Sequence, residues 1–260
     1  MNLINIKNVQ KSFLKYHQNC PYDHCIVDNF LTEDTIQKIE QEFLDYSSKK
    51  WFVYANLLEN KKACNDWNLF GPVTYSLFSY LNSQDFVEIL SRLTNINLIP
   101  DPGLHGGGWH CHGVGGNLNP HLDYSIHPKT GLQRVINIIL YVSKELRPSH
   151  GGYLGLWENR KLDDKPGKLM AEIEPRFNRA VIFNTTQNSW HGMSAPLTVP
   201  DGIYRKSLAI YYLQKIHKGT LHNKRAKFAA RDNQNEEELK DLINLRSGTE
   251  TSHLVYRDNK

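Results

Sequence analysis

Residues 119–143, NPHLDYSIHPKTGLQRVINIILYVS, contain the two patterns that decide the fold of this 260-residue chain. The first is the short polar motif His121-Leu122-Asp123. The second is the run from Val135 to Val142, which is apolar except for Asn137. Such a run is too continuous for a half-exposed strand, so it predicts a central strand buried on both faces.

The sequence around this run predicts further short strands, separated by turns. From about residue 100 onward we expect strands at 119–125, 133–143, 152–157, 168–174, 179–184, 188–193 and 206–213. Many short strands at close spacing favour a sandwich, a barrel or a jelly roll. We therefore expect a mainly β fold with flanking helices.

The flanking segments have a different texture. Near the N-terminus we expect a helix capped by Thr32, a second over 73–81 and a third starting near Ser83. After Leu213 the chain becomes polar, and Asn235 is suited to cap a late helix. The predicted organisation is a helical and strand buttress of the same domain, a catalytic core and a polar C-terminal extension, at 1–100, 101–214 and 215–260.

Composition places the chain among ordinary globular proteins, with a net charge of +4. No apolar run is long enough for a membrane span and no signal-peptide core is present, so we expect a cytoplasmic protein. Its four cysteines are too sparse for a disulfide framework and are expected as reduced thiols. We expect no nucleic-acid partner, because one cluster of basic residues is more typical of a solvated tail: Lys215, Lys218, Lys224, Arg225 and Lys227.

His121 and Asp123 are candidate metal ligands together with His191. Side chains at i and i+2 of a strand project to the same face, so the first two could share one ion. Two histidines and one carboxylate bind Fe(II) on one face and leave the opposite positions open. The spacing alone is a weak signal, since His-x-Asp arises by chance and most lone histidines are surface or hydrogen-bonded residues.

Arg205 and Ser207 strengthen this interpretation. They share one face at the start of the apolar strand that ends at Leu213, whereas Lys206 faces the other way. A guanidinium grips a carboxylate through a planar fork, so Arg205 is suited to anchor a dicarboxylate. The alternative is a surface salt bridge.

Five ordered motifs resemble the iron(II)- and 2-oxoglutarate-dependent dioxygenases, specifically their prolyl 4-hydroxylase-like branch. The similar segment runs from about His112 to Leu213. Its motifs are His112-x-x-Gly115-x-x-Leu118-x-x-His121-x-Asp123, Arg134 to Val142, Gly151-Gly152-Tyr153-Leu154, Phe183-Asn184 with Ser189-Trp190-His191-Gly192, and Arg205-x-Ser207.

The resemblance implies a double-stranded β-helix (a cupin-like jelly roll) and an Fe(II)- and 2-oxoglutarate-dependent hydroxylase. His121, Asp123 and His191 would bind Fe(II) and carry the catalysis. Arg205, Ser207 and Tyr141 would bind 2-oxoglutarate. His112 stands where the branch usually has tyrosine, and would contact the cosubstrate or the substrate. Dioxygen would be the oxidant, and ascorbate could support turnover.

Several alternatives stay open at this stage. A non-catalytic jelly-roll module that binds a sugar or a metal would need no cosubstrate anchor, and a zinc hydrolase with the same three ligands would not explain Arg205. A second metal site at His110-Cys111-His112 is a further, less favoured possibility. The substrate could be a small molecule or a peptidyl side chain, and the residues expected near it are Trp109, His127 and Trp157.

Overall fold

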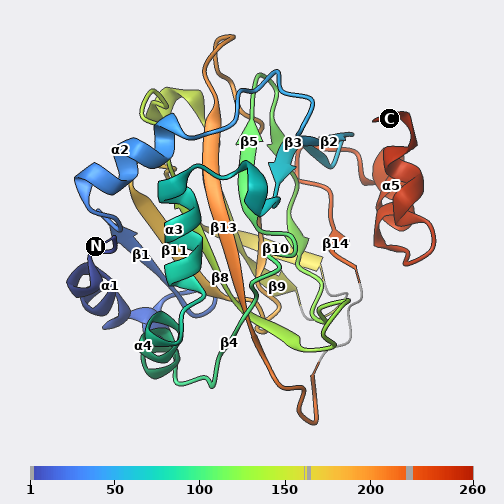
Figure 1. Ribbon diagram of the computed structural model, residues 1–260. Coiled ribbons are helices and arrows are strands. Elements are labelled where there is room, and N and C mark those ends of the chain that lie inside the picture. The colour runs from blue at the N-terminus through green and yellow to red at the C-terminus, as the bar shows by residue number, and fades with distance from the viewer. Residues whose placement is uncertain (1–2, 161, 163–164, 221–224, 260) are drawn as a thin grey trace.

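The computed structural model describes residues 3–160, 162, 165–220 and 225–259. Within them, two antiparallel sheets form a jelly-roll core, with helices on one side (Figure 1). The major sheet has the order β1-β11-β8-β13-β5-β3-β2, and β4 and β6 pair with β13 and β3. The minor sheet has the order β10-β9-β12-β7-β14. The mainly β fold class is thus confirmed.

The bounds of these elements follow from the chain. The major-sheet strands are β1 (His24–Asp28), β2 (Phe52–Ala55), β3 (Glu59–Cys64), β4 (Ile99–Pro100), β5 (Gly108–His112), β6 (Asn117–Leu118), β8 (Gln133–Tyr141), β11 (Arg179–Asn184) and β13 (Arg205–Gln214). The minor-sheet strands are β7 (His121–Leu122), β9 (Leu154–Arg160), β10 (Lys165–Ile173), β12 (Trp190–Met193) and β14 (Lys227–Phe228). The helices are α1 (Ile6–Phe13), α2 (Glu33–Gln41), α3 (Pro72–Leu81), α4 (Gln84–Thr94) and α5 (Glu236–Ser247), and the 3-10 turns are Tyr16–Gln18, Trp67–Leu69, Pro148–His150 and Ser252–Asn259.

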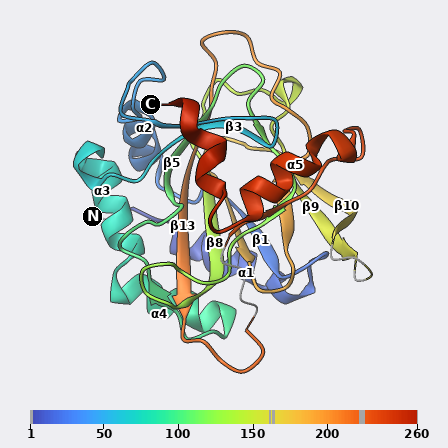
Figure 2. The ribbon, with the colours of Figure 1, turned by 90° about the vertical axis from the view of Figure 1, so that its right-hand side faces the viewer.

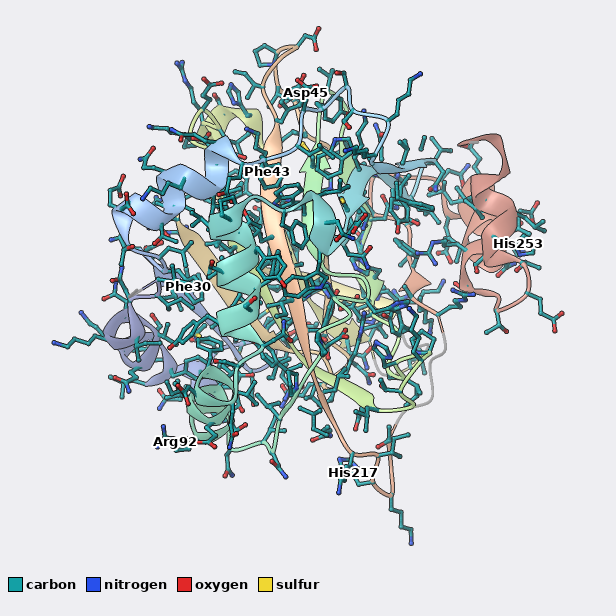
Figure 3. All side chains as sticks on the ribbon, in the orientation of Figure 1. Phe30, Phe43, Asp45, Arg92, His217 and His253 are labelled. Carbon is teal, nitrogen blue, oxygen red and sulfur yellow. The ribbon has the colours of Figure 1, made fainter. Side chains whose placement is uncertain are left out.

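The centre of the major sheet is the apolar run that the sequence singled out. β8 lies between β11 and β13, and both of its faces are covered. One face packs against the first four helices, which cover the outer side of this sheet (Figure 1). Phe30 is fully buried there and Phe43 packs against the same core, both on the helix side of the sheet (Figure 3). The other face turns toward the minor sheet.

The C-terminal helix α5 lies on the opposite side of the molecule from α1–α4 (Figure 1). Figure 2 shows α5 and the residues after it in front of the strands. Leu239 of α5 packs against Leu58 and Phe228, and Arg246 makes an ion pair with Glu59 of β3 at 2.5 Å. This segment therefore forms part of one wall of the space between the sheets.

The late helix capped by Asn235 is confirmed, since the Asn235 side chain accepts a hydrogen bond from the Glu237 amide. The three N-terminal helices are also confirmed as α2, α3 and α4, but Thr32, at the N-cap position of α2, bonds through its hydroxyl to the Thr35 hydroxyl and caps no amide. The strand expected at 119–125 is far shorter, because only His121 and Leu122 pair with neighbours. None of the described helices is long and apolar enough to cross a membrane. None of the four cysteines forms a disulfide.

The N-terminal hundred residues do more than buttress the core. β2 and β3 extend the major sheet beyond β5, and β1 forms its opposite edge. These strands complete the wall of the cavity described below. The sequence of β3, Glu59-Asn60-Lys61-Lys62-Ala63-Cys64, is mostly polar, so it carries no apolar pattern that would predict a strand.

Candidate metal centre and active site

The predicted metal ligands come together where β7 and β12 pair. His191 lies directly opposite His121 in this antiparallel pair, and the two ring centroids are 4.3 Å apart. Asp123 follows β7 immediately and lies 3.8 Å from the Nε2 atom of His121 and 3.7 Å from that of His191. Among the described residues these three form the one group suited to hold a metal ion, with ligand atoms within 4.8 Å of one another.

The strand pairing requires glycine next to His191. A Cβ atom on Gly192 would lie 2.5 Å from the backbone oxygen of Asn119, at the entry to β7. Any side chain there would push the two strands apart. The Gly192 of the His191-Gly192 motif is thus explained by the close approach of the strands that hold the histidines.

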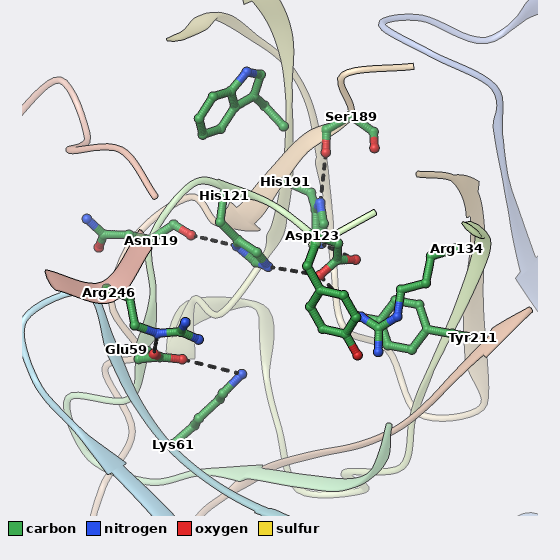
Figure 4. A network of polar contacts seen from close by, with 12 residues as sticks. Glu59, Lys61, Asn119, His121, Asp123, Arg134, Ser189, His191, Tyr211 and Arg246 are labelled. Carbon is green, nitrogen blue, oxygen red and sulfur yellow. Dashed lines mark hydrogen bonds and ion pairs between the residues drawn. The ribbon is translucent and has the colours of Figure 1, made fainter. Parts of the chain in front are cut away.

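Hydrogen bonds to the backbone orient both imidazole rings (Figure 4). The Nδ1 atom of His121 lies 2.9 Å from the carbonyl oxygen of Asn119, and that of His191 lies 2.8 Å from the carbonyl oxygen of Ser189. A carbonyl can only accept, so Nδ1 carries the hydrogen and the Nε2 lone pair faces Asp123. Such outer contacts fix the tautomer that binds a metal.

The carboxylate of Asp123 is only half satisfied by protein groups. Its Oδ1 atom accepts a hydrogen bond from the Tyr211 hydroxyl at 3.2 Å, whereas its buried Oδ2 atom has no hydrogen-bond partner. A buried carboxylate oxygen without a partner is unfavourable unless an ion fills the gap. The donor set therefore fits Fe(II), with two imidazole nitrogens and one carboxylate oxygen.

Electrostatics keep this site ready for a cation. Burial, and then the neighbouring His191, lower the pKa of His121 to about 3, so its ring is neutral. Burial opposes ionisation of Asp123, but His191, His121 and Arg134 outweigh it and lower the pKa of this carboxyl. A neutral imidazole and an ionised carboxylate are the forms that bind metal.

The expected cosubstrate anchor lies on the facing sheet. Arg205 opens β13 and is buried; its Nε–H donates to the Gly152 carbonyl at 2.8 Å, and its Nη2 donates to the Tyr141 hydroxyl at 3.3 Å. Gly152 has a φ of +72°, and a Cβ there would lie 2.9 Å from the Arg205 side chain, so glycine is required. Three of the five guanidinium N–H groups are left for another acceptor.

Strand alternation collects the remaining polar groups on the same face. Arg205 pairs with His112 of β5, and Ser207 pairs with both His110 of β5 and Tyr141 of β8. Lys206 points the other way, toward the Phe43 ring, as the alternation predicts. Both ring nitrogens of His112 are buried without a hydrogen-bond partner. The prediction that His112 faces a bound molecule thus remains a prediction, with two nitrogens available for it.

Most of these side chains line one cavity of about 390 Å³ between the two sheets, but Tyr141 is buried and absent from the lining, and contacts Arg205 instead. The cavity wall includes the metal ligands, Arg205, Ser207 and the two β5 histidines. The volume lies within the range of small-molecule sites. Burial, with Lys61 and Arg205 nearby, lowers the pKa of His110 to about 3, so His110 is neutral as well.

The three residues expected near the substrate, Trp109, His127 and Trp157, do not line this cavity, and their role stays a prediction. Trp109 is fully buried against Phe43, on the helix side of β5, because alternation places it opposite to His112. Trp157 packs in a separate cluster of the minor sheet. His127 is buried 3.5 Å from Asp101 in the loop before β8.

Further polar residues line the cavity and were not predicted as site residues, among them Glu59, Lys61, Arg134 and Tyr211. Strand alternation predicts the position of Tyr211, because Tyr211 lies an even number of residues after Arg205 and Ser207 and so shares their face of β13. Arg134 reaches the cavity because the pairing of β8 with β13 shifts next to Leu213. Its guanidinium lies between the rings of Tyr124 and Tyr211, at 3.6 and 3.7 Å.

The basic cluster is not a solvated tail throughout. Arg225 is exposed but lines the cavity, and Lys227 belongs to β14, with its amino group 5.9 Å from the Trp190 ring centre. This segment lies on the minor sheet because β14 pairs with β7. A strand of two residues leaves no pattern in the sequence from which this pairing could be predicted. Lys224 lies outside the described residues.

Comparison with known proteins agrees with this site. Residues 107–213 match the model of the 2OG-Fe(II) oxygenase superfamily. A search of curated proteins finds no match to this sequence.

Several solved structures share the fold at low sequence identity. A Trichoplax adhaerens prolyl hydroxylase, solved with a peptide fragment of the hypoxia inducible factor oxygen degradation domain, is 16% identical with a TM-score of 0.55, covering 80% of this chain and 90% of its own. A Pseudomonas putida prolyl-4-hydroxylase is 14% identical with a TM-score of 0.54, covering 80% and 100%. A Phytophthora capsici prolyl 4-hydroxylase has the same identity and TM-score, covering 98% and 83%.

The matched segment contains the whole His-Asp-His group and the arginine on the facing strand, within a jelly roll like that of prolyl hydroxylases. Over residues 107–213, this chain is similar to the 2OG-Fe(II) oxygenase superfamily.

Proposed function

We propose that this protein hydroxylates an unactivated C–H bond of a small organic molecule, with conversion of 2-oxoglutarate and dioxygen to succinate and carbon dioxide. The observation that carries the proposal is the partnerless Oδ2 atom of Asp123, which faces the Nε2 atoms of two tautomerically fixed histidines in a cavity that also holds Arg205. Fe(II) bound there would supply the oxygen chemistry.

The cosubstrate would lie between the two sheets. Arg205, with the hydroxyls of Tyr141 and Ser207, would bind its far carboxylate, and this anchor would aim the keto-acid end at the three metal ligands. His110 and His112, both neutral, offer hydrogen bonds along the way. Burial of these groups excludes bulk water and strengthens each of the polar contacts.

The reaction outcome follows from the third ligand. Related halogenases lack the carboxylate ligand, which makes room for halide. Asp123 is present and is held by Tyr211, so hydroxylation, or an outcome that begins with it such as demethylation, is the chemistry we propose.

The walls of the cavity favour a small substrate over a long peptide. Arg246 of α5 and Phe228 of β14 line the cavity, as do Phe52 and Tyr54 of β2. The C-terminal segment is fixed to β3 by the ion pair between Arg246 and buried Glu59. A bound prolyl peptide, as in the Trichoplax relative, would have to pass this wall.

The test is oxidation of 2-oxoglutarate by purified protein with Fe(II) and ascorbate. We expect succinate formation that stops in Asp123→Ala and that Zn(II) does not support. Matched release of succinate and appearance of hydroxylated product, with a panel of small molecules, would identify the substrate. Absence of succinate under every condition would favour a non-catalytic binding module, and activity with Zn(II) alone would favour a hydrolase.

A further inference from the structure

Lys61 places a positive charge in the cavity that neither the metal centre nor the cosubstrate anchor uses. It lies on β3, on the same face as Glu59 and Ala63, and Ala63 pairs with His110 on β5. The charges that act on it include those of Asp123 and Arg205. Figure 4 shows the Lys61 amino group directed toward the metal ligands.

Protein groups compensate this charge only in part: the Tyr54 ring centre lies 4.9 Å from the Lys61 amino group, and the nearest carboxylate is not hydrogen-bonded to it. Among the described residues Glu59 is the one carboxylate within ion-pair distance of Lys61, and its Oε2 atom is 3.9 Å away, beyond hydrogen-bond reach. The other oxygen of Glu59 already pairs with Arg246 at 2.5 Å. Burial lowers the pKa of Lys61 despite the opposing effect of Glu59. This direction is expected for a buried ammonium group with too few anionic contacts.

The sum of formal charges around the cavity also indicates uncompensated positive charge. The charges of Glu59 and Arg246 cancel each other. Asp123, Fe(II), the dianion of 2-oxoglutarate and Arg205 would together also sum to zero. The charges of Lys61, of exposed Arg225 and of Arg134 then remain; Arg134 is 1% exposed and has no described carboxylate within ion-pair distance. Buried positive charges without counterions are unfavourable, so a bound anion would relieve them.

We infer that the substrate carries an anionic oxygen group, a carboxylate or a phosphate, and that Lys61 binds it. This inference rests on the proposed function, because it assigns 2-oxoglutarate to Arg205 and leaves Lys61 to the second molecule. The anion would lie on the β3 wall, beside the metal ligands, with the rest of the substrate toward Phe52 and Tyr54.

The test measures binding without turnover. Protein loaded with Mn(II) and saturating 2-oxoglutarate is mixed with isobutyrate, with its neutral isostere isobutyramide, or with methyl phosphate. Bound Mn(II) enhances the nuclear relaxation of a probe that binds beside it. We expect enhancement for isobutyrate or for methyl phosphate, which separates the two anion classes, and none for isobutyramide.

The variants assign that binding to Lys61. Lys61→Met should weaken probe binding at least tenfold, and Lys61→Arg, which keeps the charge, should retain it. Lys62→Met is the matched control, because Lys62 lies on the other face of β3 and donates to the Tyr46 carbonyl. Glu59 keeps its pair with Arg246 in both Lys61 variants, and thermal unfolding will verify that each is folded.

Three results would overturn the inference. Isobutyramide could relax as strongly as isobutyrate; Lys61→Met could bind the anions as well as Lys62→Met does; or Lys61→Met could lose affinity for 2-oxoglutarate itself, which would place Lys61 in the cosubstrate site. Failure of wild-type protein to bind Mn(II) and 2-oxoglutarate would instead refute the proposed function, and this inference with it.

Discussion

Replacing Arg205 with methionine tests the cosubstrate anchor directly. Two of the five N–H groups of Arg205 are bound, one to the Gly152 carbonyl and one to the Tyr141 hydroxyl. The other three are free to make a two-pronged contact with a carboxylate. Hydrogen bonds to a charged group contribute about 1.5–3 kcal/mol each. Since Tyr141 and Ser207 remain to bind part of the carboxylate, we expect a net loss of about 3 kcal/mol, or roughly a hundredfold rise in Kd.

The assay is isothermal titration of 2-oxoglutarate into Mn(II)-loaded protein. Mn(II) affinity should be unchanged in Arg205→Met, because Arg205 touches none of the three metal ligands. Arg179→Met is a suitable control: Arg179 is a similarly buried arginine of the same sheet, paired with Asp28 at 2.6 Å and absent from the cavity wall. A folded Arg205→Met protein that binds 2-oxoglutarate within threefold of wild type would refute the assignment.

Three further predictions concern the surroundings of the site. Tyr211→Phe removes the hydrogen bond to Asp123 and should lower metal affinity about tenfold, measured by competition with a chelator; unchanged affinity would contradict the role of Tyr211. Gly192→Ala should destabilise the fold by about 2 kcal/mol in urea and weaken metal binding, because the new Cβ meets the Asn119 oxygen; a wild-type unfolding curve would speak against that clash. Burial lowers the pKa of His24 in the folded protein, so as the pH falls His24 takes up its proton more readily in the unfolded state than in the folded state. The contribution of neutral His24 to the free energy of unfolding is therefore complete above about pH 6.5 and decreases below it, by up to about 1.4 kcal/mol per pH unit. His24→Gln should lose less stability than wild type between pH 7.5 and 5.5 in urea titrations, and equal losses would exclude this contribution.

The parts of the site that follow from alternation along a strand could be predicted from the sequence. The apolar run of β8 shows that it is central, and the shared parity of Arg205 and Ser207 places both in the cavity. The same rule, applied to His112, would have turned Trp109 away from the cavity. Trp109 packs instead against Phe43 on the helix side of β5.

Other features depend on pairing between distant segments and leave no local trace. Lys61 reaches the cavity because polar β3 pairs with β5, about 50 residues later in the chain. Arg225 reaches it because β14 pairs with β7 across about 100 residues. Arg134 depends on a register shift in the pairing of β8 with β13. Tertiary pairing sets all three positions, so no periodicity in the sequence predicts them.

The direct pairing of His121 with His191 also has a kinetic consequence. The two residues are 70 positions apart, and β8, β9, β10 and β11 all lie between them in the chain. An unfolded chain would have to close that long loop before it could bring both imidazoles to one ion. We therefore expect metal to bind after the sheets have assembled, so that it slows unfolding and leaves the refolding rate nearly unchanged. The ion would thus stabilise the fold only after it has formed. Its removal by a chelator would shorten the lifetime of the native state without slowing folding.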